Sequence, residues 1–387
     1  MARETKLYEM EKPAERVILV AVDEDGSLKD DFLNELEELA QTAGAVTVGR
    51  VIQRREKRHP GHYIGKGKAE EIKIMISALD ATGIITDDEL TPAQMRNLED
   101  MLDTKVMDRT MVILDIFASR ALSNEGKIQV ELAQLKYSLT RLAGQGTAMS
   151  RLGGGIGTRG PGEKKLETDR RYIKERISEL EKSLRDISTH RELIRSGRDK
   201  KSIINVSLVG YTNAGKSTLL NRLTDAGVLA ENKLFATLDT TSRNLRLPGG
   251  TSVVLTDTVG FIRKLPHHLI KAFRATLEEL KYADILLHVV DASNPERADQ
   301  METVYSTLNE LECGETPVIT AYNKMDRDID FPLPKDTTAR DTVRISASNG
   351  NGIDELLLSI ETLIKSFKKH FKVLLPYSEG KLTAMVY

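Results

Sequence analysis

The chain has 387 residues, of which 40% are hydrophobic and 29% charged, and its formal net charge is −2. This composition excludes a disordered chain, the length predicts two or three domains, and the near-neutral charge excludes general coating of nucleic acid by a basic surface. No apolar stretch is long enough to cross a bilayer, and the polar N-terminus lacks the apolar core of a signal peptide. The single cysteine, Cys313, cannot form an internal disulfide, which fits a reducing compartment. We therefore expect a cytoplasmic protein, and a monomer.

Apolar runs and helical patterns alternate along the first 118 residues. Strands are expected at 17–25, 46–52, 82–86 and 105–108, and helices at 30–43, 70–79 and 92–102. The last of these helices has Thr91 at the N-cap and Pro92 at the first helical position, where both residue types are preferred. The alternation predicts a small α/β domain with a mostly parallel sheet over residues 1–118.

The segment 119–200 carries two heptad-like patterns that predict a long antiparallel α-hairpin, an arm, followed by a short polar linker. The first pattern consists of Ile128, Leu132, Leu135, Leu139 and Leu142. The second consists of Leu166, Ile173, Leu180, Ile187 and Ile194, with Ile177 and Leu184 between them.

The connection between the two helices, residues 143–162, contains eight glycines and is expected to form a loop at the tip of the arm. One interpretation is a flexible, solvated loop. The other is a basic tip with few side chains, whose backbone amides and arginines approach RNA phosphates closely. The candidates for such RNA contacts are Arg141, Arg151, Arg159, Lys164 and Lys165.

A phosphate-binding loop is predicted where the apolar strand 204–209 runs into a glycine-rich turn and then a helix. Its glycines allow backbone N–H groups to surround phosphate oxygens, and the helix N-terminus adds its positive end. Lys216 is expected to bridge the β- and γ-phosphates as a catalytic group, and the Ser217 hydroxyl to bind Mg²⁺. The loop consists of Gly210, Tyr211, Thr212, Asn213, Ala214, Gly215, Lys216 and Ser217.

A mobile switch segment is expected between the first helix of this domain and its next strand. Thr237 is the preferred second hydroxyl for Mg²⁺, with its amide on the γ-phosphate, and we count it among the catalytic residues. Thr240 and Thr241 remain alternatives, although they are expected to lead into a strand at 244–247 that pairs with 252–256. The segment consists of Phe235, Ala236, Thr237, Leu238 and Asp239.

The strand at 251–255 ends in a second phosphate-sensing motif. Asp257 can hold magnesium through water, and Gly260 allows its amide to approach the γ-phosphate, which makes it the third expected catalytic position. The motif consists of Asp257, Thr258, Val259 and Gly260.

Two further motifs indicate guanine. The Asp326 carboxylate matches the N1–H and N2 amino donors of guanine, whereas adenine would leave it unpaired at a penalty of about 1–3 kcal/mol. Asn323 can bind the base edge and tether the phosphate loop, and the Lys324 stem can cover the ring. The motifs consist of Asn323, Lys324, Met325 and Asp326, and of Ser346, Ala347 and Ser348, which offer a backbone N–H to guanine O6. Together these motifs predict a doubly wound, mostly parallel GTPase domain over residues 201–370.

The motifs resemble those of translation-factor-related GTPases, and the glycine-rich tip with Gly160-Pro-Gly-Glu163 is similar to the HflX family of ribosome-associated GTPases. The resemblance implies GTP and GDP binding, attachment to the large (50S) ribosomal subunit through rRNA, and GTP-dependent splitting of ribosomes. It also draws attention to Gly65-Lys-Gly-Lys68, which fits either a second phosphate site or, more simply, a turn. Family members carry a fuller C-terminal domain, so residues 371–387 are expected to be a segment that is naturally short or truncated.

The catalytic machinery is incomplete. Ras-like enzymes use a glutamine after the Asp-x-x-Gly motif to orient water, and here that position is Phe261. We expect slow intrinsic hydrolysis, with the missing groups supplied by a partner or a cation. Asn213 matches the asparagine that coordinates K⁺ in related tRNA-modification GTPases, which implies a K⁺ contribution. The alternatives are a nucleotide-gated binding switch with little turnover, and a GTPase that assists RNA modification, for which no modifying residue set is found.

Overall fold

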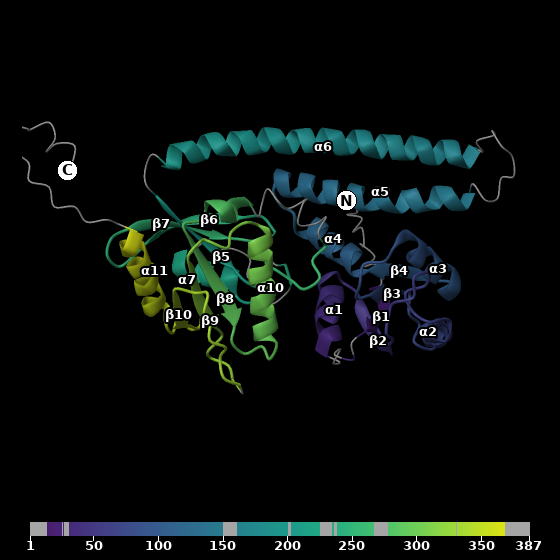
Figure 1. The fold of residues 1–387 in the computed structure, drawn as a ribbon, viewed down its shortest axis with the longest axis horizontal. Coiled ribbons are helices and arrows are strands. Elements are labelled where there is room, and N and C mark those ends of the chain that lie inside the picture. The colour runs from purple at the N-terminus through teal and green to yellow at the C-terminus, as the bar shows by residue number, and fades with distance from the viewer. Residues whose placement is uncertain are drawn as a thin grey trace, which may run out of the picture.

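The structure, a computed structural model, describes residues 14–24, 26, 31–149, 161–199, 203–224, 234–235, 238–266, 278–329 and 331–367. Two α/β domains lie side by side, and of two long helices at one edge of the molecule one runs along both domains and the other along the N-terminal domain (Figure 1). Among the described helices, none has both the length and the apolar character needed to cross a membrane.

The N-terminal domain is a four-stranded parallel sheet with the order β2-β1-β3-β4. The sequence pattern predicted nearly every element of this domain. It missed one helix, and it placed the start of α2 at residue 70, four residues after the observed start. The missed helix is α4, which Asp108 caps by accepting a hydrogen bond from Met111 N at 3.0 Å. The elements are β1 (Arg16–Asp23), α1 (Asp31–Thr42), β2 (Val46–Arg54), α2 (Lys66–Ala78), β3 (Gly83–Thr86), α3 (Pro92–Leu102), β4 (Lys105–Asp108) and α4 (Arg109–Arg120).

Helix α3 begins as its sequence predicts. The Thr91 hydroxyl accepts a hydrogen bond from Gln94 N at 3.2 Å, and Thr91 N donates to the Gln94 side chain at 3.0 Å. This reciprocal capping box satisfies two amide groups that the first turn leaves without helical partners.

The arm consists of α5 (Asn124–Met149) and α6 (Pro161–Asp199), which run side by side (Figure 1). Leu180, on the predicted seam, is 4% exposed, and ion pairs join Arg176 to Glu131 and Lys136 to Glu181, each at 2.8 Å.

The prediction that the whole segment 143–162 is a loop is wrong, because α5 continues through its first two glycines, Gly144 and Gly146. A single glycine inside a helix costs only about 1 kcal/mol relative to alanine. Helix-forming neighbours such as Ala143, Gln145 and Met149 can offset that cost. Residues 150–160 lie outside the described part of the chain.

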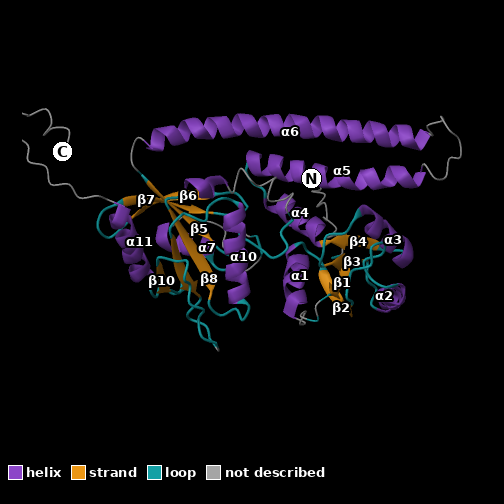
Figure 2. Ribbon diagram, viewed as in Figure 1, coloured by secondary structure: helices purple, strands orange, loops and turns teal. Residues whose placement is uncertain are grey.

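The second α/β domain has a six-stranded sheet with the order β10-β9-β8-β5-β7-β6, in which β6 pairs antiparallel with β7 and every other pairing is parallel. Helices α7 and α11 cover one face and α10 the other (Figure 2). This confirms the predicted fold class, although β6 begins three residues earlier than expected. The elements are β5 (Ile204–Val209), α7 (Lys216–Thr224), β6 (Thr241–Arg246), β7 (Ser252–Asp257), β8 (Ile285–Asp291), α10 (Arg297–Glu310), β9 (Val318–Asn323), β10 (Asp341–Arg344) and α11 (Ile353–Phe367).

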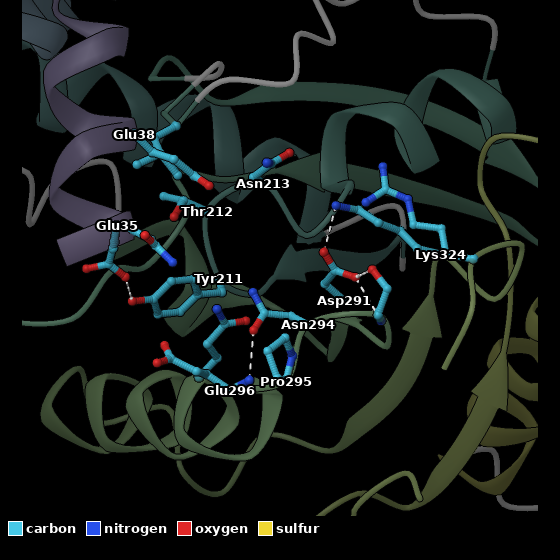
Figure 3. A pocket seen from close by; sticks show the side chains of 15 residues that line it. Glu35, Glu38, Tyr211, Thr212, Asn213, Asp291, Asn294, Pro295, Glu296 and Lys324 are labelled. Carbon is cyan, nitrogen blue, oxygen red and sulfur yellow. Dashed lines mark hydrogen bonds and ion pairs between the residues drawn. The ribbon is translucent and has the colours of Figure 1, made fainter. Parts of the chain in front are cut away.

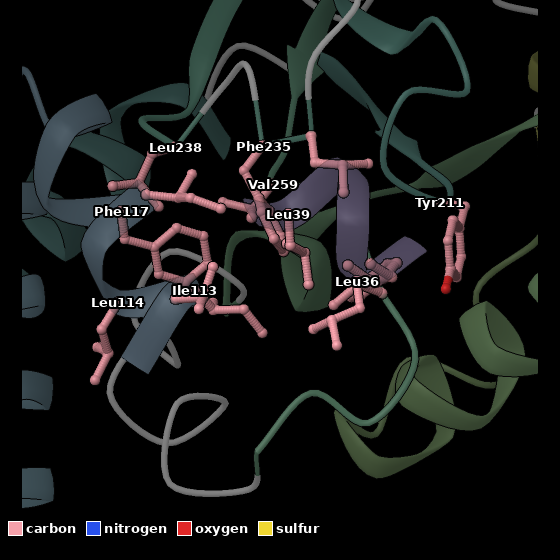
Figure 4. Packing of buried hydrophobic residues seen from close by; sticks show 14 of the residues in the cluster. Leu36, Leu39, Ile113, Leu114, Phe117, Tyr211, Phe235, Leu238 and Val259 are labelled. Atoms are coloured by element: carbon pink, nitrogen blue, oxygen red, sulfur yellow. The ribbon is translucent and has the colours of Figure 1, made fainter. Parts of the chain in front are cut away.

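One hydrophobic cluster spans the boundary between the two α/β domains. Side chains of α1 and α4 pack against the segments that follow α7 and β7 (Figure 4). Phe117 of α4 meets Phe235 edge to face, with ring centroids 4.7 Å apart. The N-terminal domain is therefore docked on the same loops in which the sequence places nucleotide-sensing motifs.

Candidate nucleotide site

The loop between β5 and α7 requires glycine at both ends. Gly210 and Gly215 have φ values of 150° and 98°. A Cβ atom on Gly210 would lie 2.2 Å from the Val289 carbonyl oxygen, and one on Gly215 would lie 2.3 Å from Asn323 Nδ2. Both glycines are thus needed for the chain to curl at the carboxyl edge of the sheet, where phosphates bind in this type of fold.

Lys216 points back into this loop. Its Nζ donates to the carbonyl oxygens of Tyr211 at 2.8 Å and Gly210 at 3.1 Å, and the residue is buried. Burial lowers the pKa of Lys216 to about 8, although the nearby Asp257 carboxylate acts in the opposite direction. A buried cation inside a ring of amides is suited to binding an anionic phosphate.

Ser217 and Asp257 come together from α7 and the end of β7. The Ser217 hydroxyl donates to Asp257 Oδ2 at 2.7 Å, and Asp257 is fully buried. A hydroxyl and a carboxylate oxygen are the hard ligands that Mg²⁺ prefers beside a bound phosphate, so these residues fit the expected metal.

The Asp-x-x-Gly segment lies directly against the phosphate loop. Phe261 N donates to Gly210 O at 3.1 Å, and Thr212 N donates to Phe261 O at 2.8 Å. The Thr258 hydroxyl donates to Leu208 O at 2.6 Å. Phe261 itself is 1% exposed, and its ring packs in the interdomain cluster.

Asn323 links three of the four motifs. Its Nδ2 donates to the Ala214 carbonyl at 2.8 Å, and its Oδ1 accepts from Ala347 N at 2.9 Å. The hydrogen bond to Ala214 is the tether between Asn323 and the phosphate loop that the sequence predicts. The base-recognition segment is fixed further because Met325 N donates to Ile345 O at 3.2 Å.

Asp326 is exposed at the mouth of the site. The Ser346 hydroxyl donates to its carboxylate at 2.5 Å and lies 2.9 Å from the Ser348 hydroxyl. The hydrogen bond from Ser346 lowers the pKa of Asp326, so the carboxylate stays ionised at neutral pH and can accept hydrogen bonds from a base. Nearby, Lys324 is paired with Asp291 at 2.7 Å.

A cavity of about 400 Å³ opens beside Thr212, Asn213 and Lys324 (Figure 3). Its opposite wall is α1, which contributes Glu35 and Glu38. Sequence reasoning missed these two carboxylates, and no local signal could have found them, because only the docking of the two domains brings α1 to this edge. Burial raises the pKa of Glu38, and the charge of Glu35 raises it further.

The switch segment lies differently from the expectation. Phe235 and Leu238 are buried in the interdomain cluster, and Asp239 binds the start of α5 rather than facing the phosphate loop. Ala236 and Thr237 lie outside the described residues. Apolar side chains of α1 and α4 offer Phe235 and Leu238 a dry surface, which explains their placement.

The five basic residues proposed for RNA contact have different positions. Arg141 is not available at the tip, because its guanidinium pairs with Asp108 at 2.7 Å and stacks over the Tyr137 ring at 4.1 Å. It ties the arm to the N-terminal domain instead. Lys164 and Lys165 lie in the first turns of α6, and Arg151 and Arg159 lie outside the described residues.

The fold and this site define a P-loop GTPase with a guanine-type recognition motif. Family models for the N-terminal and middle regions of GTP-binding GTPases match residues 30–118 and 120–198, and a model described as "50S ribosome-binding GTPase" matches 205–324. The chain belongs to the HflX family of GTPases, as the similarity of whole-length relatives shows.

Two curated relatives illustrate this membership. The chain is 61% identical to the GTPase HflX of Lacrimispora saccharolytica over 381 residues, covering 98% of this chain and 90% of the relative. It is 42% identical to the GTPase HflX of Escherichia coli over 386 residues, again covering 98% and 90%. Among solved structures, a GTP-binding protein from Sulfolobus solfataricus in complex with GDP is 25% identical, with a TM-score of 0.47 over 92% of this chain and 100% of that chain.

Proposed function

We propose that this GTPase binds the large ribosomal subunit through the tip of its arm, splits ribosomes, and hydrolyses GTP rapidly only there. The main observation behind the proposal is that the nucleotide-binding motifs are assembled in the structure, whereas the side chain that would orient the attacking water is missing. Phe261 occupies the position of the water-orienting residue and is held in the interdomain cluster. The family model described as "50S ribosome-binding GTPase" supports the choice of partner.

Each part of the site would then have a defined task. Lys216 would bind the β- and γ-phosphates, and Ser217 and Asp257 would hold a magnesium ion, Asp257 through water and with Thr237 as a further ligand. That ion would neutralise charge on the phosphate oxygens. Asp326 would select guanine, because its ionised carboxylate accepts only from a base edge that carries donors. A K⁺ ion at Asn213 would add positive charge, and equal turnover in KCl and NaCl would contradict that contribution.

The position and composition of the arm support the choice of its tip as the ribosome-binding surface. The ends at which helices α5 and α6 are joined lie at the edge of the N-terminal domain that is farther from the GTPase domain (Figure 1). Residues 150–160, between the ends of the helices, carry Arg151 and Arg159 and five glycines. A basic segment with few bulky side chains at the end of a stiff helix pair is suited to reaching rRNA phosphates in a narrow space.

The test measures GTP turnover and cosedimentation with purified 50S subunits. We expect the subunits to raise turnover by at least tenfold, and replacement of residues 150–160 by a short Gly-Ser linker to abolish both binding and stimulation. Intrinsic turnover of that variant should not change, because the deleted segment contributes none of the residues of the nucleotide site. Normal cosedimentation of the variant would contradict the role of the arm.

Point substitutions distinguish the contribution of the basic residues at the tip from that of basic residues elsewhere on the arm. The double variant Arg151→Ala and Arg159→Ala should weaken 50S binding and reduce its dependence on salt. Arg185→Ala removes an exposed arginine 24 residues along α6 from Pro161, which is about 36 Å at 1.5 Å per residue, and should not change binding. Equal effects of the two changes would indicate nonspecific attraction.

A second candidate function is a nucleotide-gated binding switch with little turnover. It is favoured by the burial of Phe235 and Leu238 between domains, since nucleotide-driven movement of this segment would change how the domains dock. Single-turnover rates with 50S subunits distinguish the two functions. A rate that stays at the intrinsic value while binding depends on GTP would favour the switch.

A further inference from the structure

Thr212, in the phosphate loop, carries a buried hydroxyl that has no hydrogen-bond partner among the described residues. The residue is 6% exposed. Leaving a buried hydroxyl unsatisfied costs roughly 1–3 kcal/mol, and folded proteins satisfy nearly all such groups. A hydroxyl left in this condition inside a binding loop indicates that a ligand atom is its partner.

The position of Thr212 indicates which part of the nucleotide it meets. A Cβ atom added to Gly260 would lie 2.9 Å from Thr212 Cγ2 and 3.0 Å from Lys216 Nζ. The Thr212 methyl group and the Lys216 ammonium group therefore both lie against Gly260, whose amide is expected at the γ-phosphate, and the Thr212 hydroxyl is bonded to the same Cβ as that methyl group. Thr212 also lines the open cavity together with Asn213. Its backbone is fixed by the 2.8 Å hydrogen bond from Thr212 N to Phe261 O.

We propose that the Thr212 hydroxyl is a catalytic group that donates a hydrogen bond to an oxygen of the γ-phosphoryl group during hydrolysis. In that step the water oxygen forms a bond to the γ-phosphorus, and the bond to the β,γ-bridging oxygen breaks with its electron pair remaining on GDP. The proton lost by the water ends on inorganic phosphate or in solvent. Thr212 keeps its own proton and stabilises the charge on the oxygens of the transferring group.

This role supplies part of what Phe261 cannot. The Phe261 ring has no hydrogen-bonding atom and is packed in the interdomain cluster, so a donor in the phosphate loop itself would contribute to the slow intrinsic reaction. The proposal concerns this intrinsic rate, and it stands whether or not the protein acts on ribosomes.

The decisive variant is Thr212→Val, which removes the hydroxyl and keeps the branched shape that packs on Gly260. We expect the intrinsic kcat to fall roughly hundredfold to thousandfold, as for loss of one preorganised donor. The affinity for GDP should stay within about twofold, because GDP lacks the γ-phosphate. Capture of GDP with aluminium fluoride, which mimics the transferring group, should weaken in parallel with kcat.

Thr212→Ser supplies the matched comparison, since it restores the hydroxyl and lacks only the methyl group. It should recover most of the activity that valine loses, and thermal unfolding should show both variants to be folded. Equal losses in valine and serine would overturn the proposal in favour of a packing role for the methyl group. An unchanged kcat in Thr212→Val, or a parallel loss of GDP affinity, would overturn it as well.

Discussion

The protonation state of Lys216 is expected to control how strongly the site binds phosphate. Its ammonium group is buried against the carbonyls of Gly210 and Tyr211, and burial lowers its pKa to about 8 from the ordinary value of 10.5. Below pH 8 the free protein already carries the charge that a phosphate needs. Above pH 8 that charge is lost before the nucleotide arrives, and binding must take a proton from solvent.

We therefore predict that GDP affinity is constant between about pH 7 and 8, where the terminal phosphate is deprotonated, and falls above pH 8, approaching tenfold per pH unit once Lys216 is deprotonated in the free protein. Isothermal titration calorimetry near pH 8.5, in buffers of different ionisation enthalpy, should detect net proton uptake. The range should stay below the pH at which guanine itself loses a proton. Heats that do not depend on the buffer would contradict the lowered pKa.

Base selection is concentrated in one exposed carboxylate. Asp326→Asn should weaken GTP binding roughly tenfold to hundredfold, since one acceptor becomes a donor that faces guanine donors, and it should improve binding of xanthosine triphosphate. Competition between the two nucleotides measures the change. Asp328→Asn, at an exposed aspartate two residues further on, is the control and should alter neither affinity. Retained preference for GTP in Asp326→Asn would refute the assignment.

At the scale of elements, the switch segment is hydrogen-bonded to the arm. Asp239 Oδ2 accepts from the backbone N–H groups of Leu122 at 2.9 Å and Ser123 at 2.8 Å, just before α5 begins. The Ser123 hydroxyl contacts the other oxygen of Asp239 and accepts from Gly126 N at 2.8 Å. A Cβ atom on Gly126 would lie 2.4 Å from Asp239 Oδ1, so this close approach requires glycine.

Asp239→Ala should lower the free energy of unfolding by about 1–2 kcal/mol, because the backbone N–H groups of Leu122 and Ser123 lose their hydrogen bonds to a charged acceptor. Urea denaturation measures the loss, and amide exchange at residues 122–126 should accelerate. Ser123→Ala shares the same hydrogen bonds, so the double variant should lose less than the sum of the two single losses. Strictly additive losses would show that the two residues act independently.

At the scale of the whole molecule, ion pairs join the domains beside the nucleotide site. Arg109 pairs with Asp87 at 2.8 Å and also contacts Glu35, which in turn binds the Tyr211 hydroxyl of the phosphate loop. Lys264, just after the Asp-x-x-Gly motif, pairs with Asp87 at 2.5 Å. The N-terminal domain thus contacts the phosphate loop through Tyr211 and the segment after the Asp-x-x-Gly motif through Lys264.

Lys264→Ala should weaken this docking by about 1–2 kcal/mol, because Asp87 and Asp88 are each 4% exposed and would lose a cation, while solvent screens part of the interaction at Lys264, whose side chain is 43% exposed. Limited proteolysis between the domains and thermal unfolding report the loss. Lys281→Ala is the control: its partner Glu312 is 76% exposed, and loss of such a surface pair should cost less than about 1 kcal/mol. Indistinguishable effects of the two variants would contradict a stabilising interdomain network.

Much of the site could be predicted because its chemistry is local. A phosphate loop needs glycines, a lysine and a hydroxyl within eight residues between a strand and a helix, and a guanine motif needs an aspartate at the end of another strand. These patterns can be recognised because a few consecutive residues supply both the backbone conformation and the hydrogen-bonding groups that the ligand needs. The order of the motifs along the chain was therefore sufficient to predict the parallel sheet and the nucleotide.

The remaining contacts depended on which faces pack together, and that is a property of the whole chain. Glu35 and Tyr211 are 176 positions apart and meet only because α1 docks beside the phosphate loop. Arg141 is a surface cation in the sequence and becomes an interdomain partner of Asp108 through the position of α5. The sequence by itself determined the nucleotide and the motifs that bind it. Tertiary structure decided which charges surround them, because long-range burial is not encoded in any short segment.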